Sequence, residues 1–406
     1  MEAWILAGTL DGRSARPALL DEVAGIPHLL RLTCDAALAG ASKIYILWDV
    51  ARPLPDLSSV FSDERIAKRA SLEIVTHPPG GAGGDEVLVV RADRIFHRDL
   101  PRAAIAAWRA GGRIGVVAGA EHDAVFATDR ATALELARAA GEPGGLAAAV
   151  ARIGTSEAPP PYLAFTAAAP DRRALHRAER RLVWSLRKSA DGLAAAWINR
   201  HISLRISWLL MRTPVHPNHI TIAALVLAIL GAAAIAHGAA VVGFLLVNLG
   251  SIIDGCDGEL ARLRYQFSRT GQWLDTVVDD LANVAYASGI ALYLTDLGVT
   301  WAAPLAFGAL GAFATTQLTQ YALLRFVYRS GDLAAIPWAM QSTELLSGRG
   351  LRSFVPKLFK RDFVLVVMLA LAIAGRLDAA LVLFAAGAAL FAVMFWTQLA
   401  RYAFAR

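Results

Sequence analysis

The sequence predicts an α-helical membrane protein with six transmembrane helices, preceded by a soluble, Rossmann-like α/β domain. Its 406 residues are 56% apolar and only 18% charged, which is more apolar than an average soluble protein. Residues 1 to about 180 mix charges, prolines and glycines among short apolar runs, whereas long apolar stretches dominate from about 219 onward. This length accommodates two domains, and we expect the boundaries to fall at 1–175, 176–216 and 217–406.

Short apolar runs alternate with helix-length segments in the first domain. Strands separated by helices indicate a parallel sheet. The N-terminus lacks the basic region and the long apolar core of a signal peptide, so we expect this domain to stay in the cytoplasm. The expected strands are Ala3–Ala7, Ile44–Trp48, Leu72–Val75, Val87–Val90, Ile114–Ala118 and Tyr162–Phe165, and the expected helices include Ile26–Ala39 and Leu100–Ala110.

A basic segment, roughly 171–212, follows the first domain. It mixes Arg and Lys with apolar residues that include Trp184, Trp197 and Trp208. This mixture is typical of an amphipathic helix on a membrane surface. The alternative is a charged linker helix in water.

Six apolar stretches then predict transmembrane helices, because several are near the roughly 20 residues that span a bilayer. Basic residues gather between the second and third stretches, between the fourth and fifth, and after the sixth. By the positive-inside rule, both termini face the cytoplasm. The net charge of +6 then reflects membrane flanks, and we expect no nucleic-acid partner. The stretches are about 219–237, 238–257, 274–295, 299–328, 362–376 and 377–402.

Four aspartates flank the connection between the second and third stretches. Asp254 and Asp257 are three residues apart, and Asp275 and Asp279 are four apart, so each pair shares a helix face. All four carboxylates can converge at the cytoplasmic mouth of two antiparallel helices. Carboxylates clustered near a bilayer are costly and repel one another, which divalent cations would offset. Oxygen ligands favour Mg²⁺ or Mn²⁺, and a pair of such ions can stabilise an in-line displacement at phosphorus.

Small and basic residues between the aspartates suit a phosphate-bearing nucleotide. Gly258 and Gly271 remove side chains where a nucleotide must approach closely, Ala261 keeps its helix face thin, and Arg262 offers a guanidinium to a phosphate. The complete pattern, Asp-x2-Asp-Gly-x2-Ala-Arg-x8-Gly-x3-Asp-x3-Asp, resembles the signature of the CDP-alcohol phosphotransferase (CDP-alcohol phosphatidyltransferase) family at every fixed position. The Pro-Asn-x-Ile-Thr element at 217–221 adds to the resemblance, which covers roughly 182–406.

The resemblance implies an activity and a set of site residues. The enzyme would transfer a phospho-alcohol from a CDP-linked donor, of the CDP-diacylglycerol or CDP-inositol type, to an acceptor hydroxyl and release CMP, in phospholipid or inositol phosphodiester biosynthesis. It would be a homodimer in the inner (cytoplasmic) membrane. Asp254, Asp257 and Asp275 would bind two divalent metals, and Asp279 would touch the second metal and act as the general base. The nucleotide-binding residues would be Asn218, Thr221, Gly258, Ala261, Arg262, Ser268 and Gly271.

The first domain resembles sugar-phosphate nucleotidyltransferases through Trp4–Gly8 and Val23–Pro27. In those enzymes a Gly-rich loop wraps a nucleoside triphosphate. Here the loop is altered, Ala18 stands where the family has a lysine, and Asp93 could match one metal-binding Asp while a second is not evident near 166–169. Since a catalytic cytidylyltransferase needs those cations, we interpret this domain as degenerate and inactive. The arrangement, with a connector at 188–203, resembles fused proteins that make CDP-inositol and then consume it.

Two further hypotheses concern the acceptor and a different class of protein. Arg325, Lys357 and Arg361 are candidate acceptor contacts, because a phosphorylated acceptor needs cations, although membrane-flank charge is the alternative for each. The chain could instead be a cation-binding membrane transporter with a nucleotide-sensing cytoplasmic domain. A transporter should show internal repeats and interrupted helices, and the sequence shows neither.

Overall fold

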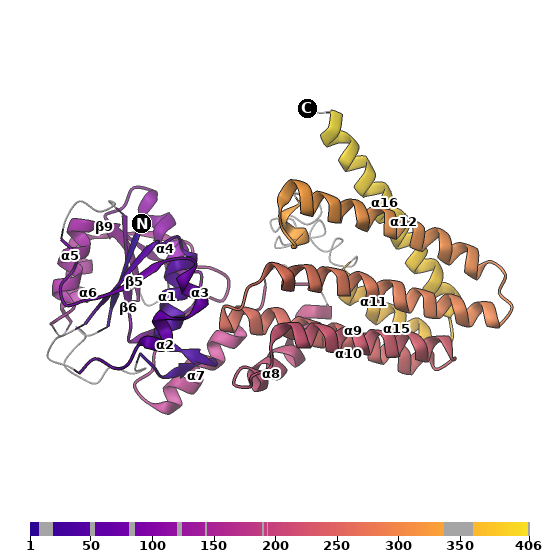
Figure 1. The fold of residues 1–406 in the computed structure, drawn as a ribbon, viewed down its shortest axis with the longest axis horizontal. Helices are drawn as coiled ribbons and strands as arrows, with labels where there is room; N and C mark the ends of the chain where they lie inside the picture. Colours follow the sequence, from indigo (N-terminus) through magenta and orange to yellow (C-terminus); the bar gives the residue numbers. More distant parts are fainter. Residues whose placement is uncertain are drawn as a thin grey trace. The chain divides into compact units, whose positions relative to one another are not determined.

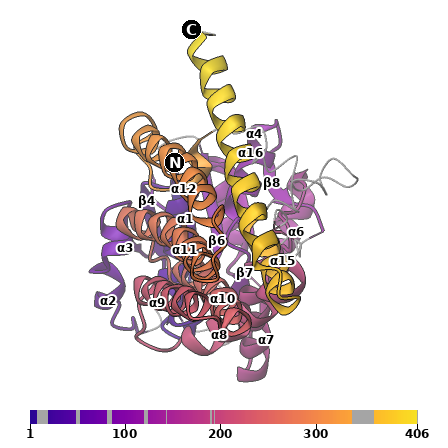
Figure 2. The same cartoon turned by 90° about the vertical axis from the view of Figure 1, so that its right-hand side faces the viewer.

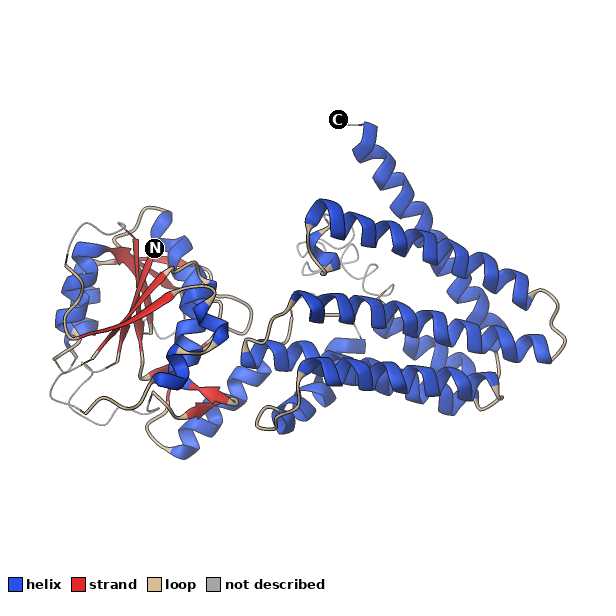
Figure 3. Ribbon diagram, in the orientation of Figure 1, coloured by secondary structure: helices blue, strands red, loops and turns tan. Residues whose placement is uncertain are grey.

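Two compact units make up the chain. The computed structural model describes residues 1–7, 19–48, 53–80, 86–119, 124–142, 144–188, 191–192, 194–336 and 360–404. The first unit is Met1–Leu186 with Leu263–Gln266, and the second is Arg187–Arg262 with Phe267–Arg406. Within the described residues, every strand belongs to the first unit, and the second unit is helical (Figure 3).

A seven-stranded mixed sheet forms the centre of the first unit, in the order β10-β8-β9-β6-β1-β4-β5. The expectation of a parallel sheet is confirmed for β6, β1, β4 and β5 and is wrong at β9, which pairs antiparallel with both of its neighbours. The connection from β8 to β9 is too short for a crossover helix, so the chain turns back on itself. The strands are β1 (Glu2–Leu6), β4 (Lys43–Leu47), β5 (Ser71–Val75), β6 (Glu86–Arg91), β8 (Ile114–Val117), β9 (Val125–Asp129) and β10 (Thr155–Ala158).

Small strand pairs lie outside this sheet. β2 (Glu22–Val23) pairs with β3 (Ile26–Pro27), and β7 (Arg94–Phe96) pairs with β11 (Thr166–Ala168). The strand expected at 162–165 is therefore wrong, because the chain becomes extended only at Thr166.

Helices cover both faces of the large sheet (Figure 1). Helices α1 (His28–Leu38), α3 (Glu64–Ala67) and α4 (Leu100–Arg109) pack on one face, and α5 (Arg130–Ala139) and α6 (Gly145–Ile153) pack on the other. Strand β1 serves both cores: Ala3 and Ile5 join the first cluster, and Trp4 and Leu6 join the second. A strand buried on both faces reads as a continuous apolar run, which is why β1 was recognisable in the sequence. The short helix α2 (Ser58–Phe61) precedes α3.

The second unit is an assembly of long helices (Figures 1 and 2). Close packing of α9 on α10 depends on glycine: a Cβ on Gly243 would lie 2.5 Å from the carbonyl oxygen of Gly231. Small residues at such crossings are typical of membrane helices. The helices are α8 (Arg200–Leu210), α9 (Pro217–Ala236), α10 (Ala240–Arg264), α11 (Arg269–Asp296), α12 (Ala302–Ala322), α15 (Arg361–Ile373) and α16 (Leu377–Phe404), with π-helical turns η1 (Ala195–Asn199) and η2 (Leu323–Tyr328) and a 3₁₀ turn η3 (Leu333–Ala335).

Three helices of the described chain are long and apolar enough to cross a membrane, namely α9, α10 and α16. The other three predicted spans exist as helices, but α15 has only 13 residues, and α11 and α12 carry polar side chains such as Asp280, Gln317 and Gln320. Six transmembrane helices are therefore not confirmed, although three helices of this length and apolarity are typical of a membrane protein.

The basic segment expected to form one helical region is divided between the two units. Helix α7 (Arg172–Trp184) belongs to the first unit, where buried Glu179 accepts a hydrogen bond from the Ala24 amide at 2.9 Å. Helix α8 and η1 belong to the second unit. Trp197 and Leu209 there are 80% and 72% exposed.

The segment Leu263–Gln266, where the chain passes from α10 to α11, is part of the first unit. The buried Tyr265 donates a hydrogen bond to the Asp35 carboxylate at 2.6 Å, and its ring lies 5.3 Å from the guanidinium of Arg31. Arg31 also donates to the Leu263 carbonyl at 2.8 Å. Polar contacts and burial therefore fix this connection.

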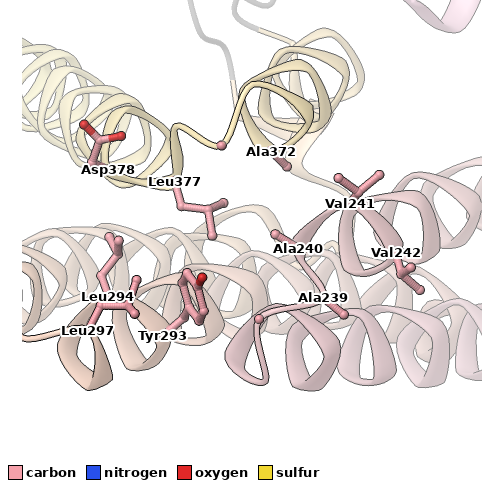
Figure 4. Close-up of a pocket in the computed structure, with 12 residues that line it drawn as sticks. Ala239, Ala240, Val241, Val242, Tyr293, Leu294, Leu297, Ala372, Leu377 and Asp378 are labelled. Carbon is pink, nitrogen blue, oxygen red and sulfur yellow. The ribbon is translucent and has the colours of Figure 1, made fainter.

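A cavity of about 450 Å³ lies where α9 passes to α10 and α15 passes to α16 (Figure 4). Ala239, Val241, Tyr293, Leu377 and Asp378 contribute to its wall. Asp254 lies at least 12 residues beyond the cavity residues 238–242, at a rise of about 1.5 Å per residue. The 450 Å³ cavity therefore lies at the start of α10, and the motif lies in the second half of this helix.

Candidate active site

Three of the four predicted aspartates come together where α10 and α11 meet. Asp254 and Asp257 lie on α10 and Asp275 on α11, and one carboxylate oxygen from each lies within 4.8 Å of the others. The Oδ1 atom of Asp254 is buried and has no hydrogen-bond partner among the described residues. A buried carboxylate oxygen without a partner is costly, and a cation among three carboxylates would remove that cost. The cluster could hold a metal ion, and its oxygen-only ligands suit Mg²⁺ or Mn²⁺.

The fourth aspartate, Asp279, has a different partner. Its carboxylate forms an ion pair with Arg361, the first residue of α15. The positive charge of Arg361 also attracts the carboxylates of Asp254 and Asp275. The structure therefore places Asp279 beside the cluster but engages it with a cation, which the spacing of the aspartates alone could not indicate.

Asp257 is oriented by α9. The buried hydroxyl of Thr221 donates a hydrogen bond to its carboxylate, and the Gly258 amide donates another. The charge of Arg262 acts on both Asp257 and Asp275. A Cβ on Gly258 would lie 3.2 Å from the nearer guanidinium nitrogen of Arg262, so a side chain at 258 would crowd that cation.

The remaining predicted nucleotide contacts lie at the start of α11. Ser268 caps this helix, because its hydroxyl accepts a hydrogen bond from the Gly271 amide at 2.9 Å. A Cβ on Gly271 would lie 3.2 Å from the side-chain oxygen of Asn218, so Asn218, Ser268 and Gly271 adjoin one another. Ala261 is half-buried on α10.

The three predicted acceptor contacts differ in their placement. Arg361 reaches Asp279, as described above. Arg325 lies in η2 with an exposed side chain. Lys357 lies outside the described residues.

Sequence reasoning missed Glu259, which is fully buried two residues after Asp257. Its carboxylate accepts hydrogen bonds from Arg200 at 2.6 Å, Ser203 at 2.7 Å and Ser207 at 2.6 Å. These three residues lie on one face of α8, because they are three or four apart. Glu259 therefore fixes α8 to the side of α10 that faces away from Thr221.

Lys188, which the sequence indicated only as part of the connector, also acts on the cluster. Its charge acts on Asp275. The charge of Arg262, together with burial, lowers the pKa of Lys188 to about 8. Asp191 accepts hydrogen bonds from the Lys188 amide and from Arg200, each at 3.0 Å. The connector thus brings a second cation to the region of Arg262.

In the first unit, the candidate metal ligand Asp93 forms an ion pair with a neighbouring arginine. Arg91 donates two hydrogen bonds to its carboxylate, at 2.9 and 2.7 Å. The imidazole of His28 donates a hydrogen bond from Nε2 to the Ala92 carbonyl at 2.9 Å. Burial lowers its pKa to about 4, so the ring is neutral at pH 7. The altered loop at 8–13 and Ala18 lie outside the described residues.

Comparison with known proteins agrees with this geometry. Residues 214–398 match the family model described as CDP-alcohol phosphatidyltransferase. The matched residues make up slightly less than half of the chain and contain the complete aspartate motif. Its similar relatives include proteins named bifunctional IPC transferase and DIPP synthase from Rubrobacter xylanophilus, Aquifex aeolicus and Thermococcus kodakarensis.

These relatives match only part of the chain. The Rubrobacter protein is 40% identical over 146 residues, which are 36% of this chain and 34% of the relative. The Aquifex protein is 34% identical over 26% of this chain and 24% of its own length. The Thermococcus protein is 33% identical over 37% of this chain and 34% of its own length. The chain therefore matches about a third or less of each relative's length. The similarity to CDP-alcohol phosphatidyltransferases is therefore established for residues 214–398.

Proposed function

We propose that the second unit transfers a phospho-alcohol from a CDP-linked donor to the hydroxyl of an acceptor alcohol and releases CMP, with the help of two divalent cations. The observation that carries this proposal is the cluster of Asp254, Asp257 and Asp275, with Asp279 one helical turn beyond it. Two such cations, when bound, would neutralise the pyrophosphate and the developing charge on the leaving group.

The chain's own cations and small residues supply the donor site in this proposal. Arg262 and Lys188 attract the pyrophosphate, since a guanidinium and an ammonium group both bind phosphate oxygens. Gly258 and Gly271 leave room for the nucleotide beside them. Thr221 holds the Asp257 carboxylate in a fixed orientation, which pre-arranges a ligand before any cation binds.

Asp279 is the proposed general base. The acceptor oxygen attacks the β-phosphorus of the donor, a new P–O bond forms, the bond to CMP breaks, and the acceptor's proton passes to Asp279. A base must lie within hydrogen-bond reach of the proton it takes. The carboxylate is engaged by Arg361 in the structure, so Arg361 must turn away from it before the proton is taken.

The first unit is proposed to be a nucleotidyltransferase-like domain (1–175) without catalytic activity. The relatives' names join two activities, but the engagement of Asp93 by Arg91 leaves this carboxylate poorly placed to bind a cation. Nucleotide binding by this domain without turnover is its proposed role. An inner-membrane location with both termini cytoplasmic, a surface-bound segment at 176–216 and a homodimer complete the proposal.

The test is metal-dependent CMP release by the purified full chain with a panel of CDP-linked donors and acceptors. Asp279→Asn should lower turnover by about 10²- to 10⁴-fold, the usual contribution of a general base, and should keep much of the CDP affinity. Asp296→Asn, at the exposed far end of the same helix, is the matched control and should keep full activity. If Asp279→Asn retains the full rate, the assignment of the base is wrong. Cation binding without CMP release from any donor would favour the transporter hypothesis instead.

A further inference from the structure

A cavity of about 360 Å³ lies among α11, α12, α15 and α16, next to the Asp279–Arg361 pair. Its polar wall consists of Arg361 and Asn283. Asn283 follows Asp279 by four residues and so shares its helix face one turn deeper. The rest of the wall is apolar and includes Tyr286, Phe313, Val364, Phe384, Phe391 and Met394. The cavity therefore has a polar part beside the proposed base and an apolar body.

The volume suits a substrate of moderate size. Sites for small molecules occupy roughly 300–1,000 Å³, and an apolar cavity of about 150 Å³ already holds benzene. A cavity of about 360 Å³ is therefore large enough for a hydrocarbon chain. An apolar wall with few polar groups does not provide the hydrogen bonds that a sugar or polyol would need there.

Exposed apolar residues of α16 border the apolar body. Helix α16 is one of the three helices apolar enough to cross a membrane. Three of its residues on the cavity wall remain well exposed: Leu383 and Phe391 are 38% exposed, and Leu390 is 46% exposed. A molecule that is dissolved in the bilayer could therefore enter with its chain first.

The polar part favours an anionic head group. The Nε atom of Arg361 is buried and has no hydrogen-bond partner in the part of the chain that the structure describes. A phosphate on the acceptor would bind this guanidinium more strongly than a neutral group would. It would also compete with Asp279 for Arg361, and so would free the carboxylate only when an acceptor is present.

We propose that the acceptor is an amphiphile, with one hydrocarbon chain that fills this cavity and a head group whose phosphate binds Arg361 and whose free hydroxyl faces Asp279. This inference rests on the proposed function and names the chemical class of its acceptor. The bonds formed and broken are those given above, and the cavity adds only the position of the acceptor.

Glycine 387 allows a direct test. It lines the cavity, and a Cβ added there meets no other atom within 4 Å, so Gly387→Leu adds a bulky side chain to the cavity wall at a position where its Cβ meets open space. Gly308→Leu on α12 is the matched control, because Gly308 also has open space around it and is not part of this wall.

The probe is 1-O-dodecyl-glycerol 3-phosphate with a photoreactive diazirine in its chain, added to the full chain in phosphatidylcholine nanodiscs. Wild type and Gly308→Leu should be labelled within residues 383–394, and excess unlabelled dodecyl-glycerol phosphate should compete. Gly387→Leu should lose at least tenfold of this labelling. Arg361→Gln should lose the preference for the phosphate probe over the same probe without phosphate.

Equal labelling of Gly387→Leu and Gly308→Leu, or labelling spread over all lipid-facing helices, would overturn the inference. So would transfer to glycerol 3-phosphate that is as efficient as transfer to its dodecyl ether and insensitive to Gly387→Leu. Labelling requires neither donor nor turnover. Labelling that depends on Gly387 without any CMP release would therefore reject the proposed function and leave the cavity as a binding site for this amphiphile.

Discussion

Glu259 offers the sharpest test of how the site is held together. Its carboxylate is fully buried and receives three hydrogen bonds from α8, at 2.6, 2.7 and 2.6 Å. Glu259→Ala removes all three at once and leaves Arg200, whose side chain is only 13% exposed, with Asp191 as its remaining acidic partner. The substitution should therefore separate α8 from α10 without touching any proposed metal ligand.

The expected loss of stability follows from the kind of bonds involved. A hydrogen bond to a charged group contributes about 1.5–3 kcal/mol, but three bonds to one carboxylate are not additive. Removal of one partner of a buried ion pair costs about 3–5 kcal/mol, and we expect this range for Glu259→Ala because the Arg200–Asp191 pair survives. Glu259→Gln keeps the shape and one acceptor oxygen, so we expect roughly half of that loss.

Thermal unfolding of the detergent-solubilised full chain measures this effect. The control is Glu64→Ala, which breaks an ion pair with Lys68 in which both side chains are largely exposed, 83% and 76%. An exposed pair of this kind contributes about 0.2–1 kcal/mol. If Glu259→Ala destabilises the protein no more than Glu64→Ala does, then Glu259 does not fix α8 to α10, and the reasoning from burial fails.

Two further predictions concern Thr221 and Asp35. Thr221→Val keeps the shape of the side chain but removes the hydrogen bond that orients Asp257. The apparent affinity for Mg²⁺ in the CMP-release assay should therefore fall about 10- to 100-fold. An unchanged affinity would show that Asp257 needs no such orientation. Burial raises the pKa of Asp35 from 3.8 to about 7, although the hydrogen bond from Tyr265 opposes this shift. Between these two pH values the folded chain holds a proton that the unfolded chain has released. The free energy of unfolding should therefore fall as pH rises from about 4 to about 7. Asp35→Asn should remove this fall, measured as the wild-type minus variant difference in hydrogen-exchange protection of β1 across that range, and a difference independent of pH would contradict the assignment.

Much of the first unit could be predicted because its strands are apolar runs, and β1, β6 and β8 are buried on both faces. Strands β1, β4, β5, β6 and β8 read as short apolar runs in the sequence and appear where they were expected. Strand β9, Val125–Asp129, was missed, since its run of apolar residues is short and ends in Thr and Asp. Its direction depends on the length of the preceding connection, which periodicity does not report.

In the site, too, local spacing could be predicted from the sequence, whereas contacts between distant residues could not. Asp254 and Asp257 could be placed together because they are three residues apart on one helix. Asp275 could be added because the connection between the two antiparallel helices is short. The partner of Asp279 could not, because Arg361 reaches it from another helix far along the chain. Glu259 was hidden for the same reason: its three donors lie on α8, and only tertiary packing shows that they meet it.

The cations near the acidic residues also bear on how metal binding would affect the binding of donor and acceptor. Three carboxylates without a metal ion require positive charge nearby, and Arg361, Arg262 and Lys188 act on them in the structure. Each of these cations has a second role in the proposed reaction, with the acceptor for Arg361 and the donor pyrophosphate for the other two. Divalent cations that bind the carboxylates would release all three for the substrates, because the same carboxylates cannot hold both sets of charge equally well. Metal binding should therefore strengthen the binding of donor and acceptor even at cations that touch no metal.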